Sequence, residues 1–355
     1  MSNEHSSETK ASKLWKKMEN ERDGKTAATV SKARAAFEDV HRLIEGLYLN
    51  KVFKAETLRS ALSYEPEEGD VFIASYPKCG TTWLQHIVLN IFFADKLTPH
   101  ELEEMRKGSY LEFVGAEGAR KLHRPTAIKT HLPYFKLPYP AKAKYIYVTR
   151  NPYDCCVSYY HHLRAMPWHR FAEGTFDELL DMFIEGKVDY GDYFDHLLSW
   201  YEHRDDPNVL FLTYEEVKKN ARSCVLSIAD FLGKQEYGDR LRTNPEYLET
   251  VLSGISFETM KKLSFSIGAS TDESHRKREG CANDSSQVPR STQVKISPYK
   301  NRDEGPLVGD LVRKGVVGDW RNQFSPEKIT RMKAWIARKT QGSDVMELWN
   351  DVYLP

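Results

Sequence analysis

Hydrophobic and polar positions along the chain predict short strands separated by helices. Four apolar runs rich in β-branched and aromatic residues are predicted as buried strands, at 70–76, 126–131, 144–149 and 209–214. Apolar residues at helical spacing predict helices at about 31–50, 81–94, 154–163, 175–185, 193–202, 215–232 and 326–339. This order predicts an α/β fold with a parallel sheet, in which ligands bind at the carboxyl ends of the strands.

Two segments have no such periodicity. Residues 1–30 are rich in Lys, Glu, Ser and Ala, which predicts a disordered or loosely helical tail. Residues 264–305 are rich in Ser, Asp, Lys, Arg and Gly, and a loop of this length is typical of a functional lid or a disordered insertion. We therefore expect one domain over 31–355 that carries a long mobile loop at 264–305 and covers its ligand with it.

Composition narrows the class of protein. Lys plus Arg and Asp plus Glu both number 51, so the net charge is zero, which argues against a nucleic-acid binder that works by bulk charge. Five cysteines without regular spacing indicate a reducing compartment rather than a disulfide framework. Neither a signal peptide nor a run of about 18 apolar residues occurs, so we expect no membrane partner and a cytoplasmic location.

The strongest chemical signal is Tyr76-Pro-Lys-Cys-Gly-Thr-Thr-Trp83, between a predicted strand and a predicted helix. Gly80 permits close backbone approach, and the helix-start amides, the two threonine hydroxyls and the Lys78 ammonium form an anion cradle. The lysine precedes the glycine, so this is not a Walker A loop, and an ordinary strand–turn–helix is the alternative.

Two further segments carry cations suited to a phosphate. In Thr149-Arg-Asn-Pro-Tyr-Asp-Cys-Cys-Val-Ser158, Arg150 closes a strand and Ser158 lies about one turn into the next helix. In Arg313-Lys-Gly-Val-Val-Gly-Asp-Trp-Arg-Asn322, two adjacent cations precede a glycine. Taken singly, the first could be a surface arginine with a helix-facing serine, and the second is more often a solvated turn.

Together these three motifs closely resemble the cytosolic sulfotransferase family, and the resemblance runs from about residue 69 to 339. It implies a single P-loop-like domain with a central parallel β-sheet flanked by helices. It also implies 3′-phosphoadenosine 5′-phosphosulfate (PAPS) as the donor of a sulfuryl group, release of 3′-phosphoadenosine 5′-phosphate (PAP), and no metal.

By the same resemblance, each part of the donor has its own set of residues. The 5′-phosphosulfate would be held by Lys78, Gly80, Thr81 and Thr82, with Cys79 in place of the usual serine contributing its amide. The 3′-phosphate would be held by Arg150, Ser158, Arg313, Lys314 and Gly315. The adenine would lie between Trp83 and Phe257, with Met260 and Tyr214 beside it, whereas Ile255 replaces a threonine common in the family.

The catalytic residues follow from the segment Ile128-Lys-Thr-His-Leu-Pro133, which matches the family's catalytic strand. His131 would take the proton from the acceptor as a general base. Lys78 would stabilise charge on the leaving phosphate, and Lys129 would steady the sulfuryl oxygens. Ser158 could hold Lys78 aside until an acceptor arrives.

Several functions compete with a sulfotransferase. A P-loop kinase or NTPase would need a Walker lysine and a magnesium site, for which the sequence has only loose substitutes. A non-catalytic PAPS- or PAP-binding module conflicts with an intact Lys78, Lys129 and His131, and a dehydratase would yield an alkene instead of a sulfate ester. A Golgi carbohydrate sulfotransferase would need an N-terminal anchor. The motif resemblance therefore favours a sulfotransferase with a small-molecule acceptor.

The acceptor is less defined. Segments 134–139, 166–168 and 247–254 are expected to line its pocket, and their aromatic and apolar residues fit phenols, catecholamines and sterols. His161 and His162 could line the pocket or have core or surface roles. The run 322–327 departs from the family's dimerisation segment, so a homodimer remains open.

Overall fold

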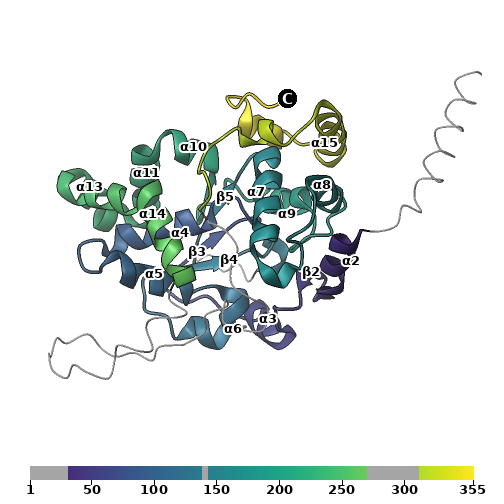
Figure 1. The fold of residues 1–355 in the computed structure, drawn as a ribbon. Coiled ribbons are helices and arrows are strands. Elements are labelled where there is room, and N and C mark those ends of the chain that lie inside the picture. Colours follow the sequence, from purple (N-terminus) through teal and green to yellow (C-terminus); the bar gives the residue numbers. More distant parts are fainter. Residues whose placement is uncertain (1–30, 138–142, 270–311) are drawn as a thin grey trace, which may run out of the picture.

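A four-stranded parallel sheet forms the centre of the protein (Figure 1). We use a computed structural model that describes residues 31–137, 143–269 and 312–355. The strand order is β4-β3-β5-β6, with β3 at Asp70–Ala74, β4 at Thr126–Thr130, β5 at Lys144–Thr149 and β6 at Val209–Thr213. All four lie where the sequence predicts them, which confirms the α/β fold with a central parallel sheet.

Helices cover both faces of the sheet and enclose two hydrophobic cores. Along β3, Val71 and Ile73 face one core, while Phe72 and Ala74 face the other, as the alternation of strand side chains requires. The first core lies under α4 (Thr81–Phe93), α5 (Pro99–Lys107), α11 (Ala221–Gly233), α12 (Asp239–Thr243) and α13 (Pro245–Gly254). The second lies under α3 (Ala55–Leu62), α6 (Leu111–Arg120), α7 (Pro152–Ala165), α8 (Phe176–Ile184), α9 (Tyr193–Tyr201) and α15 (Pro326–Lys339).

The helix predicted over 31–50 is wrong in its second half. The helix α2 spans only Lys32–Asp39, and the hairpin of β1 (His41–Ile44) and β2 (Leu47–Asn50) follows it. Glu45 and Gly46 form the connection, both with positive φ (51° and 77°), as a two-residue hairpin turn requires. The apolar spacing of this segment fits a helix and a hairpin equally, and the turn decides between them.

Two other element boundaries differ from the sequence prediction. The helix expected over 215–232 is divided into α10 (Tyr214–Lys219) and α11 by Asn220, whose backbone leaves the helical region at φ −133°. Helix α14 spans Phe257–Ala269, so the first residues of the predicted 264–305 loop are helical. The rest of that loop and the predicted tail at 1–30 lie outside the described residues. Within the described residues, no helix is both long and apolar enough to cross a membrane.

Candidate functional site

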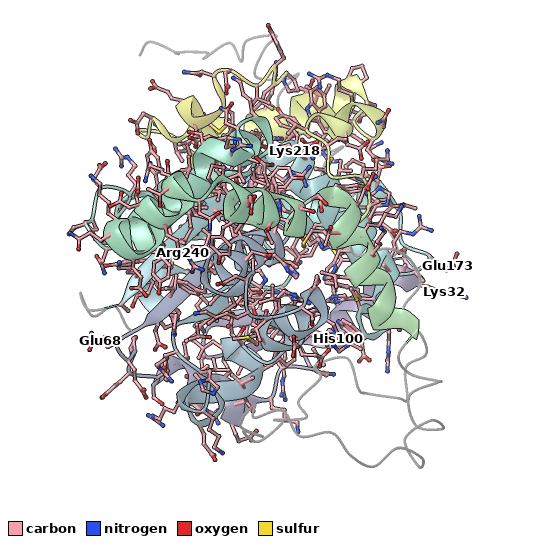
Figure 2. All side chains as sticks on the ribbon, turned by 90° about the vertical axis from the view of Figure 1, so that its left-hand side faces the viewer. Lys32, Glu68, His100, Glu173, Lys218 and Arg240 are labelled. Atoms are coloured by element: carbon pink, nitrogen blue, oxygen red, sulfur yellow. The ribbon has the colours of Figure 1, made fainter. Side chains whose placement is uncertain are left out.

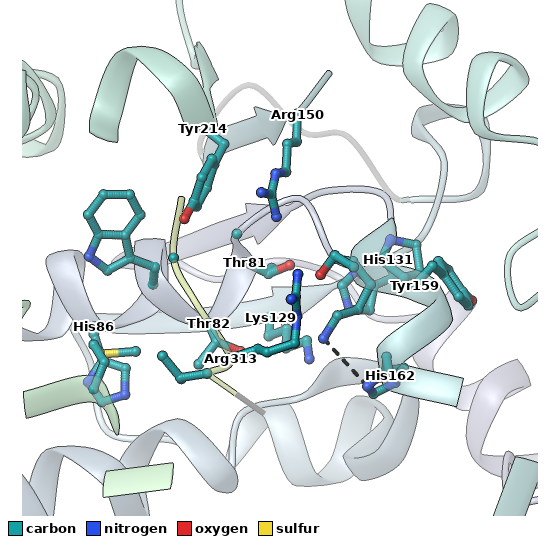
Figure 3. A pocket seen from close by; sticks show the side chains of 18 of the residues that line it. Thr81, Thr82, His86, Lys129, His131, Arg150, Tyr159, His162, Tyr214 and Arg313 are labelled. Atoms are coloured by element: carbon teal, nitrogen blue, oxygen red, sulfur yellow. Dashed lines mark hydrogen bonds between the residues drawn. The ribbon is translucent and has the colours of Figure 1, made fainter. Parts of the chain in front are cut away.

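A cavity opens at the carboxyl ends of the parallel strands, where the sequence places its chemical motifs (Figure 3). Nearly all predicted site residues line it: Lys78, Gly80, Thr81, Thr82, Trp83, Lys129, His131, Arg150, Ser158, Tyr214, Phe257, Met260, Arg313, Lys314 and Gly315. Residues distant in sequence therefore meet because their strands end at one edge of the sheet.

The loop between β3 and α4 has the backbone of an anion cradle. Lys78 has φ +73° and Gly80 has φ +112°, so the chain turns sharply before the helix begins at Thr81. A Cβ at Gly80 would lie 3.0 Å from the Tyr214 ring, which explains the glycine. The amides of the first turn of an α-helix such as α4 have no intrahelical partner, so they can donate to an anion in the cavity.

The Lys78 ammonium lies in the cavity beside a histidine rather than the serine that the resemblance indicates. Its Nζ donates to Nδ1 of His162 at 3.4 Å, drawn as a dashed line in Figure 3. In the described part of the chain no hydrogen bond joins Lys78 to Ser158, and the role of Ser158 in holding Lys78 aside stays a prediction. Burial, and next the charge of Arg150, lower the pKa of Lys78 to about 8.

His131 is held in the tautomer that a general base needs. Its Nδ1 lies 2.7 Å from the carbonyl oxygen of Ser75, so this nitrogen carries the proton and donates. Nε2 consequently keeps its lone pair. Burial, and next the charge of Lys129, hold the pKa of His131 well below its usual value, so the ring is neutral at pH 7.

Glu112 and two tyrosines support His131, and sequence reasoning missed all three. Glu112 accepts hydrogen bonds from the His131 backbone amide at 2.6 Å and the Tyr190 hydroxyl at 3.1 Å. The rings of Tyr110 and Tyr190 lie edge-on to His131, with centroids 5.6 and 5.4 Å away. Burial raises the pKa of Glu112 to about 7. No local signal marks these residues, because their link to His131 is made only in the folded chain.

Lys129 extends from β4 into the same space as His131 (Figure 3). Its Nζ lies 4.3 Å from the ring centroid of Tyr110, a cation–π contact. Burial, and next the charge of Arg106, lower the pKa of Lys129 to about 7. A negative charge in the cavity would favour its protonated form.

Arg150 and the late segment 313–322 form the opposite side of the cavity. The Arg150 guanidinium donates to the Val316 carbonyl at 2.8 Å and lies 4.4 Å from the centre of the Tyr214 ring. Its buried Nε has no hydrogen-bond partner among the described residues. Asp154 on α7 holds the late segment by accepting from the Gly318 amide at 2.7 Å and the Trp320 amide at 2.9 Å. An orphaned donor on a fixed arginine is suited to an anionic ligand.

Two aromatic rings flank one space at the edge of the cavity. The ammonium of Lys218, labelled in Figure 2 on α10, lies 6.0 Å from the Trp83 ring centre and 5.9 Å from that of Phe257. The indole of Trp83 is fixed by its hydrogen bond to the Ile255 carbonyl at 3.0 Å. A Cβ at Gly315 would lie 2.7 Å from the Phe257 ring, so only glycine fits there. A flat base between these two rings is compatible with this arrangement.

One residue that was predicted to bind the sulfuryl donor, Cys79, does not line the cavity. Cys79 is fully buried, its sulfur lies 3.7 Å from that of Cys155, and its amide donates to the Tyr76 carbonyl at 3.3 Å. His162 lines the cavity whereas His161 does not.

The expected acceptor segments can be located in part. Trp168 lines the cavity, whereas Tyr134 stacks on His203 and the Tyr247 hydroxyl donates to the backbone of α4. Residues 138 and 139 lie outside the described residues, and the assignment of the three segments to an acceptor stays a prediction. The cavity is also lined by residues that the sequence did not indicate: Val52, Phe53, Tyr110, Phe113, Tyr159, His169, Asp189 and Tyr190.

The chain also resembles characterised proteins. A family model described as the sulfotransferase domain matches residues 68–295. The luciferin sulfotransferase of Photinus pyralis is 32% identical, over 82% of this chain and 77% of its own length. Sulfotransferase 1C2 of Homo sapiens is 30% identical, over 80% of this chain and 87% of its own.

Solved structures agree with these matches. A mouse sulfotransferase complexed with PAP has a TM-score of 0.64 and 29% identity, and the match covers 88% of this chain and 99% of that one. A retinol dehydratase complexed with retinol and PAP has a TM-score of 0.63 and covers 91% of this chain and 95% of its own, and at 23% identity it supports the fold alone.

Proposed function

Because this chain belongs to the sulfotransferase family, we propose that it transfers the sulfuryl group of PAPS to a hydroxyl or amine of a small, aromatic or hydrophobic acceptor, with His131 as the general base. The observation that carries the proposal is the convergence of the phosphate loop, Arg150, the late cations and the tautomer-fixed His131 on one cavity. The cytoplasm remains the proposed location, and phenols, catecholamines and sterols remain the proposed acceptor classes.

The charges of the cavity fit a donor with several phosphate and sulfate groups. Within the described residues, seven cations line it against two carboxylates, Glu103 and Asp189; the cations are Lys78, Arg106, Lys129, Arg150, Lys218, Arg313 and Lys314. Lys314 and Arg313 pair with Asp319, which holds both side chains near the cavity rim. Such an excess attracts anions and raises their local concentration.

The acceptor would be activated by His131. Nε2 of this ring accepts the acceptor proton as the acceptor oxygen or nitrogen attacks sulfur, and the resulting imidazolium donates from Nδ1 to the Ser75 carbonyl. Glu112 fixes the backbone of His131, so we assign it a positioning role. The proton thus moves to a buried side chain, because His131 is only 6% exposed.

The leaving group would be stabilised by the two lysines. PAPS supplies an activated sulfur whose bond to the phosphate oxygen breaks as the new bond forms. Lys78 places positive charge where the departing phosphate gains negative charge, and Lys129 places it beside the sulfuryl oxygens.

A nucleotide with a 3′-phosphate should stabilise the protein most. We expect PAP to raise the melting temperature clearly and ATP, which lacks that phosphate, to raise it far less, because ligand binding to the native state shifts melting by mass action. Thermal shift assays at equal nucleotide concentration measure this. Equal shifts with PAP and ATP would contradict the assignment of Arg150, Arg313 and Lys314 to the 3′-phosphate.

PAP binding should take up protons at alkaline pH. The pKa of Lys78 is about 8 in the free protein and must rise beside an anion. At about pH 8.5 the free ammonium is largely deprotonated and the bound form is charged, so affinity falls as pH rises through 8. Calorimetry in buffers of different ionisation enthalpy gives the number of protons taken up. A Lys78→Met protein that takes up as many would show that another group, such as Lys129, is responsible.

A further inference from the structure

The two carboxylates that line the cavity, Glu103 and Asp189, have different environments. Glu103 is neutralised by Arg106, whose guanidinium donates to it at 2.8 and 2.7 Å. Asp189, in the connection between α8 and α9, is 7% exposed and lines the cavity. Within the described residues, no lysine or arginine forms an ion pair with it. Asp189 is therefore the cavity carboxylate that is paired with a histidine, His41, instead of an arginine or lysine in that part of the chain.

The neighbours of Asp189 form hydrogen-bond or ion-pair contacts with its Oδ1 atom and leave its Oδ2 atom without a hydrogen bond among the described residues. Oδ1 accepts from the Asn50 amide at 2.7 Å and lies 3.3 Å from Nε2 of His41. Oδ2 has Nε2 of His169 at 3.8 Å, beyond hydrogen-bond distance. The His41 ring lies behind Asp189, fully buried, with Nδ1 bound to the Phe37 carbonyl. Oδ2 is the oxygen available to a ligand in the cavity.

Asp189 is ionised at neutral pH. Burial acts to raise its pKa, but the nearby His41, then His169 and the Asn50 amide, outweigh burial and lower it. Burial lowers the pKa of His169 to about 4, so His169 is uncharged at pH 7. His41 serves Oδ1, so Oδ2 is the carboxylate oxygen with which an ammonium group in the cavity can pair.

Aromatic rings form the wall between Asp189 and the reaction centre. Phe53 stacks on Phe113 at 4.6 Å and meets Tyr190 edge-on at 5.8 Å. Tyr190, next to Asp189 in the chain, has its ring 5.4 Å from that of His131. Trp168 lines the same region. A flat ring held along this wall would have one end at His131 and the other toward Asp189.

Building on the proposed function, we propose that Asp189 selects acceptors that are phenols with a protonated amine on a short arm. The phenol hydroxyl reaches Nε2 of His131, and the ammonium donates to Oδ2 of Asp189. This charge contact is made at the acceptor end and leaves the sulfuryl transfer itself unchanged.

Three phenols that differ in charge test this selection. Tyramine, 4-ethylphenol and 4-hydroxyphenylacetate carry positive, zero and negative charge on arms of similar length. With PAPS and the full-length enzyme, we expect kcat/KM to be at least about tenfold higher for tyramine than for 4-ethylphenol, since hydrogen bonds between charged groups are the strong ones. The acid should be the poorest. A wild-type enzyme without a preference for tyramine overturns the inference.

A matched pair of variants locates the selection. Asp189→Asn should reduce the ratio of kcat/KM for tyramine to kcat/KM for 4-ethylphenol by about tenfold. Asp205→Asn removes the same charge from an exposed surface carboxylate and should keep the ratio. An unchanged ratio in a folded Asp189→Asn protein would contradict the proposal, and a PAP-induced melting shift shows that the variant is folded.

A binding measurement separates this inference from the proposed function and needs no variant. Calorimetry on the PAP complex should show that 2-phenylethylamine binds at least about tenfold tighter than 2-phenylethanol, and equal binding overturns the inference. Sulfation of 4-ethylphenol without amine preference leaves the proposed function intact, whereas absence of both PAP binding and sulfation overturns that function.

A metal ion is the alternative ligand that the residues around Asp189 could bind. Donor atoms of His41, His169 and Asp189 lie within 4.8 Å of one another, a cluster that could hold a metal ion and that the sequence did not reveal. A melting-temperature rise with zinc chloride that Asp189→Asn abolishes would assign Asp189 to a metal and overturn the amine proposal. We expect no such rise.

Discussion

His131→Ala should lower kcat by about a hundredfold to ten-thousandfold, the usual contribution of a general base. The mutation removes the Nε2 lone pair that the Ser75 hydrogen bond orients, and the acceptor then keeps its proton during attack. PAP affinity should change little, because this ring serves the acceptor. Steady-state kinetics and PAP calorimetry on the same preparation give both values.

Two controls make the His131 result specific. Added imidazole should restore part of the turnover, since a free base can enter the space that the side chain leaves. His123→Ala, at an exposed position, should keep wild-type kinetics. If His131→Ala retains most of its turnover, another base operates, and His162, which lines the same cavity, becomes the next candidate.

Lys78→Ala should weaken turnover and donor binding together, with kcat/KM for PAPS falling by at least about a hundredfold, as when one oxyanion-stabilising donor is removed. In the proposed mechanism the ammonium lies beside the transferring group in the ground state and the transition state alike, so we expect both kcat and KM to change. Steady-state kinetics with varied PAPS measures the two constants.

Arg150→Ala is the matched comparison for Lys78. Its guanidinium is held by the Val316 carbonyl and the Tyr214 ring, and we propose that it binds the 3′-phosphate, away from the bond that breaks. We expect a higher KM for PAPS with a smaller fall in kcat. If both variants raise KM for PAPS by the same factor and lower kcat by the same factor, Lys78 only binds the donor. Lys129 would then be the residue that stabilises charge in the transition state.

The local order of residues is sufficient to predict the sheet and the phosphate loop. Strands buried on both faces are continuous apolar runs, so β3, β4, β5 and β6 can be located from their residues alone. The loop from Tyr76 to Trp83 is equally evident, because a glycine, a lysine and a helix start are adjacent in the chain. Motif order then indicates the family, and the family match agrees.

Local sequence patterns do not predict the secondary structure where one spacing of apolar residues fits both a helix and a hairpin. The hairpin β1–β2 has apolar positions that also suit a helix, and the positive φ of Glu45 and Gly46 is a property of the folded turn. The division of α10 from α11 at Asn220 likewise interrupts flanking residues that have helical periodicity, because the Asn220 backbone leaves the helical region.

The sequence by itself therefore determined the sheet, the donor motifs and the family, whereas the tertiary structure decided the surroundings of the reaction centre. Glu112, Tyr190 and Asp189 carry no motif, and their roles arise from contacts with His131, Asn50 and each other across long stretches of chain. The placement of His162 beside Lys78 is also a product of folding. The physical reason is that backbone conformation follows largely from neighbours in sequence, while burial, pKa and pocket chemistry depend on which distant side chains the fold brings together.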